Sequence, residues 1–157
     1  MAETIAIASD HAAFELKALL IDWLREQGHA VRDLGPATAD SVDYPDYGYR
    51  LAAAIASGEA TRGVALCGSG IGISIAVNRD PACRCARVEG GLSARLARQH
   101  NDANVIAFGA RLVGADTAKD ILTEFLGTAF EGGRHQRRVD KLTGPDPISS
   151  RTERQPA

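Results

Sequence analysis

The feature that most constrains this chain is the alternation of short apolar runs with longer amphipathic segments. The run from Thr4 to Ser9 is apolar almost throughout, as expected of a strand buried on both faces. The segment over residues 13–27 carries large apolar side chains at helical spacing, and Gly28 follows as a helix C-cap. Further strands are predicted at residues 30–34, 63–67, 84–88 and 105–108. Further helices are predicted from 43–45 onward and at 73–78, 92–99 and 115–126.

Strands that alternate with helices predict a parallel sheet with helices on both faces. With five predicted strands, the expected fold is a three-layer α/β/α sandwich, Rossmann-like or flavodoxin-like. In such sheets the ligand binds at the carboxyl ends of the strands. The turns after the first, third and fifth predicted strands are therefore the first places to look for a site.

Length and composition fit one compact domain. The chain has 157 residues, of which 45% are hydrophobic and 24% charged. We expect a single domain over residues 1–143 and a polar, disordered tail over residues 144–157. No apolar run is long enough to cross a membrane, and no signal peptide is visible, so we expect a cytoplasmic protein.

Charge and cysteine content exclude several function classes. A net charge of −2 argues against a general nucleic-acid binder, and 5% aromatic residues are too few for base stacking. We therefore expect neither nucleic acid nor a membrane as a partner. Three cysteines, an odd number in a chain without an export signal, do not indicate a disulfide framework.

A glycine-rich turn, Gly68-Ser69-Gly70-Ile71-Gly72, follows the third predicted strand. Its amides, at the start of a predicted helix, would favour an anion. Ile73 stands where a dinucleotide-binding turn needs glycine or alanine, and the turn lacks the lysine of an NTPase phosphate loop. A tight strand-to-helix turn that needs positive φ angles is the alternative interpretation.

Cys67 lies directly before this turn. A buried cysteine is most often a small hydrophobic residue, but neighbouring amides can also lower a thiol pKa or stabilise an oxyanion. Cys83 and Cys85 share one face of a predicted strand, and core packing is favoured for both. A redox role for this pair stays open, although its spacing is not that of a thiol–disulfide motif.

Two polar pairs follow predicted elements. Asp10-His11 comes after the first strand, where it could direct a carboxylate and an imidazole into the ligand cleft, or where Asp10 could cap a helix. His100-Asn101 follows a helix, whose C-terminus favours a charged imidazole, so a structural role is an alternative.

The remaining candidates are arginines. On a helix, Arg134 and Arg138 would project together and could hold a phosphate, although a solvated basic face is the plainer interpretation. Arg111 lies in the turn after the fifth predicted strand, at the expected ligand-binding edge.

Together these motifs resemble the type B ribose-5-phosphate isomerases and their relatives, the galactose-6-phosphate and allose-6-phosphate isomerases. The resemblance covers about residues 4–143. Its carriers, in order, are Ser9-Asp10-His11, Asp43-Tyr44-Pro45, the segment from Cys67 to Ser74, Arg98-Gln99-His100-Asn101-Asp102, the segment from Asn104 to Gly109, and Glu131-Gly132-Gly133-Arg134-His135-Gln136.

The resemblance implies an isomerase that interconverts ribose 5-phosphate and ribulose 5-phosphate through an enediolate, without metal or cofactor. It implies Cys67 as the base, Ser69 and the turn amides at the enediolate oxygen, and His100 as the ring-opening residue. Asp10 would assist at the substrate hydroxyls. The implied substrate and phosphate contacts are His11, Tyr44, Gly68, Gly70, Ile71, Gly72, Asn101, Arg111, Arg134 and Arg138.

Some relatives lack the cysteine and use a glutamate where this chain has Ile73, so this chain resembles the cysteine-based type. In this family His100 and Asn101 reach the site from the neighbouring subunit. The resemblance therefore implies a homodimer, or a dimer of such dimers, with shared active sites. Allose 6-phosphate, galactose 6-phosphate or a tetrose phosphate stay open as substrates, as does a non-catalytic sugar-phosphate-binding module.

Overall fold

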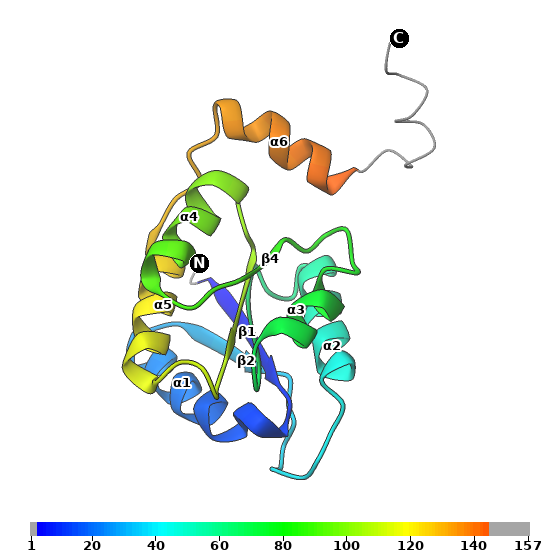
Figure 1. Ribbon diagram of the computed structural model, residues 1–157, viewed down its shortest axis with the longest axis vertical. Coiled ribbons are helices and arrows are strands. Elements are labelled where there is room, and N and C mark those ends of the chain that lie inside the picture. Colours follow the sequence, from blue (N-terminus) through cyan, green and yellow to red (C-terminus); the bar gives the residue numbers. More distant parts are fainter. Residues whose placement is uncertain (1–2, 145–157) are drawn as a thin grey trace.

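A single five-stranded sheet forms the centre of the computed structural model, which describes residues 3–144. All its pairings are parallel, in the order β2-β1-β3-β5-β4. Figure 1 shows the strands between helices on either side. The strands are β1 (Thr4–Ser9), β2 (Ala30–Asp33), β3 (Arg62–Cys67), β4 (Cys85–Arg87) and β5 (Val105–Gly109). The expected five-stranded parallel sheet is confirmed, with the fourth strand reduced to three residues.

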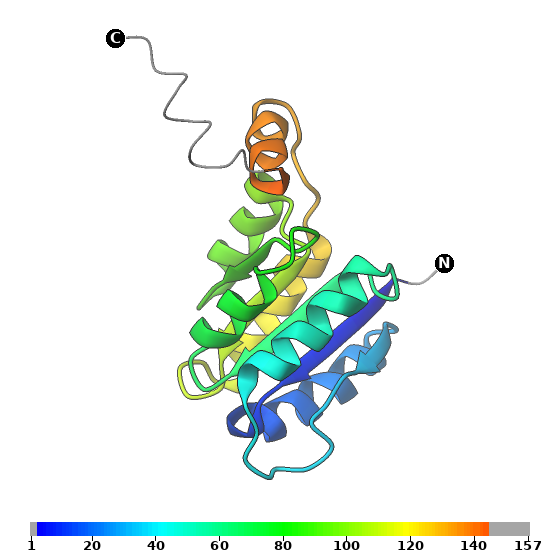
Figure 2. The ribbon, with the colours of Figure 1, turned by 90° about the vertical axis from the view of Figure 1, so that its right-hand side faces the viewer.

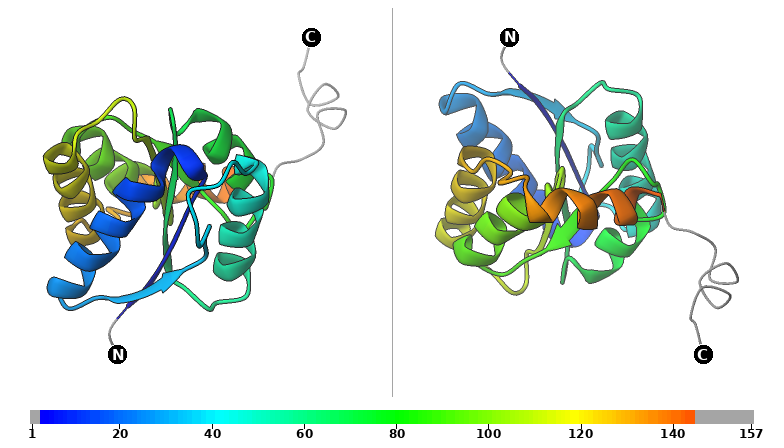
Figure 3. Two further views of the ribbon diagram at one scale, coloured as in Figure 1. Left: turned by 90° about the horizontal axis from the view of Figure 1, so that it is seen from below. Right: turned by 90° about the horizontal axis from the view of Figure 1, so that it is seen from above.

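Helices cover both faces of the sheet, as the sequence predicted (Figure 3). One face carries α1 (Phe14–Glu26), α4 (Gly91–Asn101) and α5 (Ala115–Gly127), and the other carries α2 (Tyr44–Ala56) and α3 (Ile71–Val77). A short 3-10 helix (His11–Ala13) precedes α1. The basic segment forms α6 (Arg134–Thr143), which lies across one end of the sheet beside α4 (Figures 1 and 2).

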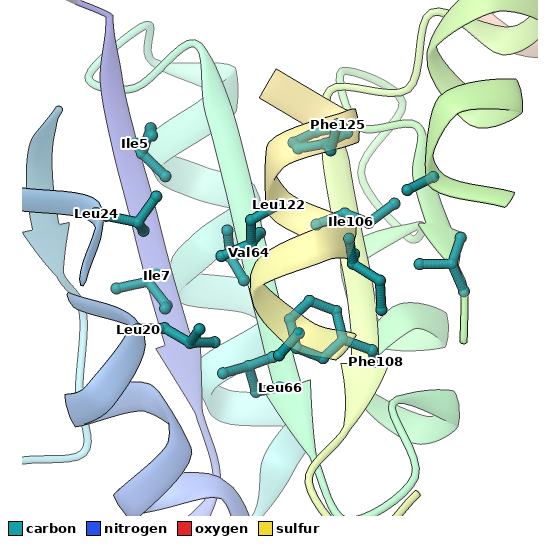
Figure 4. Packing of buried hydrophobic residues seen from close by; sticks show 14 of the residues in the cluster. Ile5, Ile7, Leu20, Leu24, Val64, Leu66, Ile106, Phe108, Leu122 and Phe125 are labelled. Carbon is teal, nitrogen blue, oxygen red and sulfur yellow. The ribbon is translucent and has the colours of Figure 1, made fainter. Parts of the chain in front are cut away.

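The two faces of the sheet carry side chains of different size. Ile5, Ile7, Val64, Leu66, Ile106 and Phe108 point toward α1 and α5, where they meet Leu20, Leu24, Leu122 and Phe125 (Figure 4). The alternate positions face α2 and α3 and are mostly alanine. These small side chains let α2 and α3 approach the sheet closely. A Cβ on Gly48 of α2 would lie only 2.8 Å from the Cβ of Ala76 in α3.

Parallel strands give the sheet two chemically different ends. At the carboxyl end, the Asp10 N–H donates to Leu66 O and the Ala110 N–H donates to Cys67 O. At the amino end, the Thr61 N–H donates to Thr4 O and the Gly63 N–H donates to Asn104 O. Because α4 runs antiparallel to the strands, its last residues lie at the amino end, where α6 also lies.

The described residues contain no helix long and apolar enough to cross a membrane. Apart from Gly144, the predicted tail over residues 144–157 lies outside the described residues.

Candidate active site

Cys67 is the last residue of β3, and its side chain is only 4% exposed. The Gly70 N–H donates to its Sγ at 3.1 Å, so the glycine-rich turn closes directly over the sulfur. This places the one cysteine at the carboxyl end of the sheet beside a backbone donor. The sequence predicted this arrangement from the position of Cys67 before the turn.

The turn itself fits tightly against the end of β5. Gly70 has a φ of 76°, and a Cβ there would lie 2.7 Å from the backbone of Phe108. A Cβ on Gly109 would similarly lie 2.6 Å from Ser69 Cα. The tight-turn interpretation with positive φ is therefore confirmed for Gly70, and close backbone approach explains Gly109.

The other two glycines of the turn contact side chains from separate elements. A Cβ on Gly72 would lie 2.5 Å from the Tyr44 ring, which comes from the start of α2. A Cβ on Gly68 would lie 3.2 Å from Arg111 Nη1, and the Arg111 N–H donates to Gly68 O at 3.1 Å. The structure thus brings Tyr44 and Arg111 to the turn that follows Cys67, as the sequence analysis expected.

Part of the expected anion cradle is already used within the turn. The Gly70 N–H is engaged by Cys67 Sγ, and the Ile71 N–H donates to Ser69 Oγ at 3.2 Å. The Ser69 hydroxyl accepts in that bond, which leaves its own proton to donate to a ligand. A ligand oxygen at this turn would therefore rely on the hydroxyl and the remaining amides.

Asp10 and His11 lie at the same end, directly after β1. Asp10 is 7% exposed, and its Oδ1 accepts the Ala12 N–H at 3.0 Å, so the capping interpretation is confirmed. The Val42 N–H donates to His11 Nδ1 at 3.1 Å. Nδ1 also lies 3.2 Å from Val42 O, so the backbone of Val42 occupies this nitrogen in either tautomer, and Nε2 is the ring nitrogen left to contact a ligand.

The second set of predicted residues lies at the amino end of the sheet. His100 and Asn101 form the end of α4, and Arg134 and Arg138 project from exposed positions one turn apart on α6. His135, on the same helix, stacks on His100 with ring centroids 4.4 Å apart and planes 13° from parallel. This contact fixes α6 on the end of α4.

A single chain therefore does not bring all the predicted site residues together. Cys67 ends a strand, whereas His100 ends a helix that runs in the opposite direction, so they lie at opposite ends of the sheet. In Figure 1, β1 points away from the end that carries α6. We call these two sets the cysteine group (Asp10, His11, Tyr44, Cys67 to Gly72, Arg111) and the histidine group (His100, Asn101, Arg134, Arg138).

Each group has residues that line a hollow in the surface. Tyr44 and Gly72 line one of about 210 Å³ beside the cysteine group. Asn101 lines another of about 450 Å³ along the edge strand β4, together with Cys83, Cys85 and Leu142. No residue of the cysteine group lines this larger hollow.

His135 is the residue of this region to which the sequence analysis gave no role. It is 7% exposed, and burial, followed by the charges of His100 and Arg134, lowers its pKa. The imidazole is therefore neutral at neutral pH. Its position within the segment from Glu131 to Gln136 was the available signal, but its contact with His100 depends on tertiary structure.

Cys83 and Cys85 are free thiols outside both groups. Cys83 packs in the core beneath α2, and burial raises its pKa to about 11. Burial also raises the pKa of Cys85. These surroundings favour the packing interpretation, because thiols held protonated are poor nucleophiles and poor metal ligands.

Both the sequence and the fold match a family of sugar isomerases. The family model described as ribose/galactose isomerase matches residues 5–142. Ribose-5-phosphate isomerase B of Escherichia coli is 45% identical over 139 residues, which cover 88% of this chain and 93% of that protein. D-erythrulose-4-phosphate isomerase of Pectobacterium atrosepticum is 41% identical, over 88% of this chain and 92% of that protein.

Solved structures of ribose 5-phosphate isomerases are similar to this chain in both sequence and fold. A ribose 5-phosphate isomerase from Thermotoga maritima has a TM-score of 0.88 and 48% identity, over 90% of this chain and 97% of that chain. The type B enzyme of Trypanosoma brucei has a TM-score of 0.89 and 39% identity, over 93% and 100%. The chain belongs to the ribose/galactose isomerase family, and within it is a sugar-phosphate isomerase of the ribose-5-phosphate isomerase B type.

Proposed function

We propose that this protein interconverts ribose 5-phosphate and ribulose 5-phosphate. The observation that carries the proposal is Cys67, whose Sγ lies under the Gly70 N–H in the same turn as the Ser69 hydroxyl. The names of the Escherichia coli and Thermotoga maritima relatives support the five-carbon substrate. The Pectobacterium relative, named for a four-carbon substrate, supports a tetrose phosphate as the alternative.

The proposed reaction moves two protons, one from C2 to C1 and one from O2 to O1, and needs no external oxidant. The Cys67 thiolate removes the proton from C2 of the open-chain aldose, and the electron pair forms the enediolate. The Ser69 hydroxyl and the free amides of the turn donate to the enediolate oxygen. That proton is then returned to C1 while the hydroxyl proton on O2 passes to O1, which leaves a carbonyl at C2 and a hydroxyl at C1. Asp10 assists by accepting a hydrogen bond from a substrate hydroxyl.

Ring opening and phosphate binding fall to the other proposed residues. His100 moves a proton to the ring oxygen, and Asn101 and Tyr44 contact the sugar. The phosphate is held by Arg134 and Arg138, together with His11 and Arg111. Arginine is well suited to this because its guanidinium forms paired hydrogen bonds with phosphate oxygens.

The distance between the two groups along the sheet supports a homodimer with shared active sites. If the partner is placed so that its histidine group meets the cysteine group, each site takes residues from both chains. The helices that flank the edge strand β4 expose large apolar side chains. Ile71, Ile75 and Leu92 are 52%, 53% and 63% exposed, and a dimer interface would bury them.

The base is tested with Cys67→Ala. This variant should lose at least about 100-fold in kcat, as expected for loss of a general base, while still binding the sugar phosphate. Cys83→Ala is the matched control, because it also removes a buried thiol from the same core cluster. Wild-type kcat in Cys67→Ala would contradict the proposed role of the sulfur.

The substrate is tested by comparing kcat/KM for four-, five- and six-carbon aldose phosphates. The proposal expects the highest value for ribose 5-phosphate, and a higher value for a tetrose phosphate would favour the alternative. Formation of the ketose phosphate separates both from a binding module. A protein that binds all three sugars without converting any of them would not be an isomerase on these substrates.

A further inference from the structure

Three side chains that can ligate a metal lie together where α6 begins. His100 comes from the end of α4, Glu131 from the connection between α5 and α6, and His135 from the first turn of α6. Each offers one ligand atom, and these atoms lie within 4.8 Å of one another. Within this cluster, His135 Nε2 lies 3.6 Å from Glu131 Oε2.

The backbone builds this cluster through a specific turn. The Glu131 N–H donates to Gln99 O at 3.0 Å, which anchors the connection beside His100. Gly132 and Gly133 follow with φ angles of 62° and 54°, and the His135 N–H donates to Gly132 O at 3.0 Å. Two successive positive φ values suit glycine and reverse the chain, so that His135 returns onto His100.

The two imidazoles have no competing hydrogen bonds. Within residues 3–144, neither the His100 nor the His135 ring forms a hydrogen bond, although His135 is only 7% exposed. Neither ring nitrogen of His135 is among the buried side-chain atoms without a partner, so both are open to solvent or to an ion. The stacked pair thus presents ring nitrogens that a cation could occupy.

We propose that His100, Glu131 and His135 form a binding site for a divalent transition-metal ion such as Zn²⁺, and that an ion bound there inhibits the isomerase. Two imidazoles and one carboxylate are a ligand set that Zn²⁺ uses in proteins, at about 2.0–2.2 Å from each ligand atom. Water would complete the tetrahedron.

Modest side-chain movement would complete the coordination. Tetrahedral ligands at these bond lengths lie roughly 3.4 Å apart, so ligand atoms that now lie within 4.8 Å have to approach by at most about 1.4 Å. Glu131 is exposed, and rotation about the terminal torsions of histidine and glutamate is easy. One of the stacked rings has to tilt out of its parallel orientation so that both lone pairs meet the ion.

The inhibition part rests on the proposed function of His100 as the ring-opening residue. A ring nitrogen that ligates a metal no longer has its lone pair free to exchange a proton. Occupation of the site would therefore block ring opening, while the cysteine group at the other end of the same chain stays unaltered. Metal binding itself does not depend on that proposed function.

Binding is tested by titrating the metal-free full chain with Co²⁺ and Zn²⁺. Calorimetry should show about one ion per chain, and the Co²⁺ spectrum should lack a thiolate-to-metal band, since all proposed ligands are nitrogen or oxygen. Glu131→Gln and His135→Gln should each weaken binding by at least about tenfold, because even outer-shell changes cost that much. His29→Gln, which alters a histidine outside the cluster, should bind like wild type.

Two results would overturn the site: unchanged affinity in both Glu131→Gln and His135→Gln, or a thiolate band that disappears when Cys83 and Cys85 are replaced by serine. Circular dichroism of each variant establishes that weaker binding is not a loss of fold.

Inhibition is tested with the same proteins. Zn²⁺ should inhibit the wild-type enzyme, and a chelator should restore its activity. Glu131→Gln should keep its activity without metal and need at least about tenfold more Zn²⁺ for the same inhibition. Full activity with the site occupied would contradict the inhibition. Metal binding by a chain without any isomerase activity would instead contradict the proposed function and leave the metal site standing.

Discussion

Two separate constraints require glycine at position 70, a positive φ angle and a close backbone neighbour. The φ of Gly70 is 76°, and a Cβ would lie 2.7 Å from the Phe108 backbone. Gly58 has nearly the same φ, 77°, but a Cβ there would meet nothing within 4 Å. We predict that Gly58→Ala costs about 1–2 kcal/mol of unfolding free energy from backbone strain alone. Gly70→Ala should cost clearly more, because the glycine-rich turn must also move away from the Phe108 backbone in β5.

Urea unfolding of the two variants measures the difference. The activity of Gly70→Ala should also fall, because its N–H would move away from Cys67 Sγ. Equal stability losses at the two positions would show that the turn can yield to a methyl group without cost.

Cys83 gives a prediction about pH. Burial raises its pKa to about 11, so the folded protein holds it as the neutral thiol until the pH approaches that value. Since only the thiolate reacts with iodoacetamide, Cys83 should be alkylated far more slowly at pH 8 than free cysteine, whose pKa is about 8.5. The rate should rise as the pH is raised toward 11. Mass spectrometry of the Cys67→Ser variant reports this reaction, and rapid labelling at pH 8 would contradict it.

At the scale of elements, one buried cation joins α1 to the end of β2. Lys17 is 2% exposed and donates to Asp33 Oδ1 at 2.7 Å and to Pro36 O at 2.9 Å. We predict that Asp33→Asn costs about 1.5–3 kcal/mol of stability, because hydrogen bonds to a buried charge are among the stronger ones. Glu59→Gln breaks the exposed pair with Arg32 and should cost less than about 1 kcal/mol. Denaturant unfolding of both variants compares them, and equal losses would contradict the importance of burial.

Elements were predictable where the pattern is local. The apolar run Thr4–Ser9 and the stripe of α5 set their own conformations, and both are found where predicted. The order of the strands depends on contacts between distant parts of the chain. β5 lies between β3 and β4, and the sequence of the edge strand β4 does not predict this. The sequence did not predict α6 firmly, because this segment is polar and lacks a broad apolar stripe. In the structure, the buried side chains of His135 and Val139 attach the helix to the rest of the protein.

The candidate site also has a part that the sequence predicts and a part that depends on tertiary structure. Most residues of the cysteine group end or directly follow a strand, so the rule that ligands bind at carboxyl ends was enough to place them together. Tyr44 begins α2 instead, and only the resemblance to the family pointed to it. The stacking of His135 on His100 joins residues 35 positions apart through a glycine turn, and no spacing rule predicts it. Which residues could meet across a sheet was predictable, and which side chains would touch was not.

At the scale of the whole molecule, the opposite placement of the two groups makes the proposed site testable by mixing subunits. Cys67→Ala and His100→Asn should each be inactive alone, since every site of either homodimer lacks one essential side chain. In a mixed dimer, one of the two sites combines an intact Cys67 with an intact His100. Equal amounts that pair at random give half mixed dimers, so the mixture should recover about a quarter of wild-type activity.

The matched control pairs Cys67→Ala with Ser69→Ala, provided that Ser69→Ala is itself strongly impaired. Both changes fall in the cysteine group, but on different chains of a mixed dimer, so neither of its sites has both side chains intact. This mixture should recover nothing beyond the residual activity of its components, whereas Cys67→Ala with His100→Asn should. Subunits are exchanged by partial denaturation and refolding, and activity is measured at fixed total protein. Recovery in neither mixture, with mixed dimers demonstrated by mass, would place the whole site within one chain and contradict the shared arrangement.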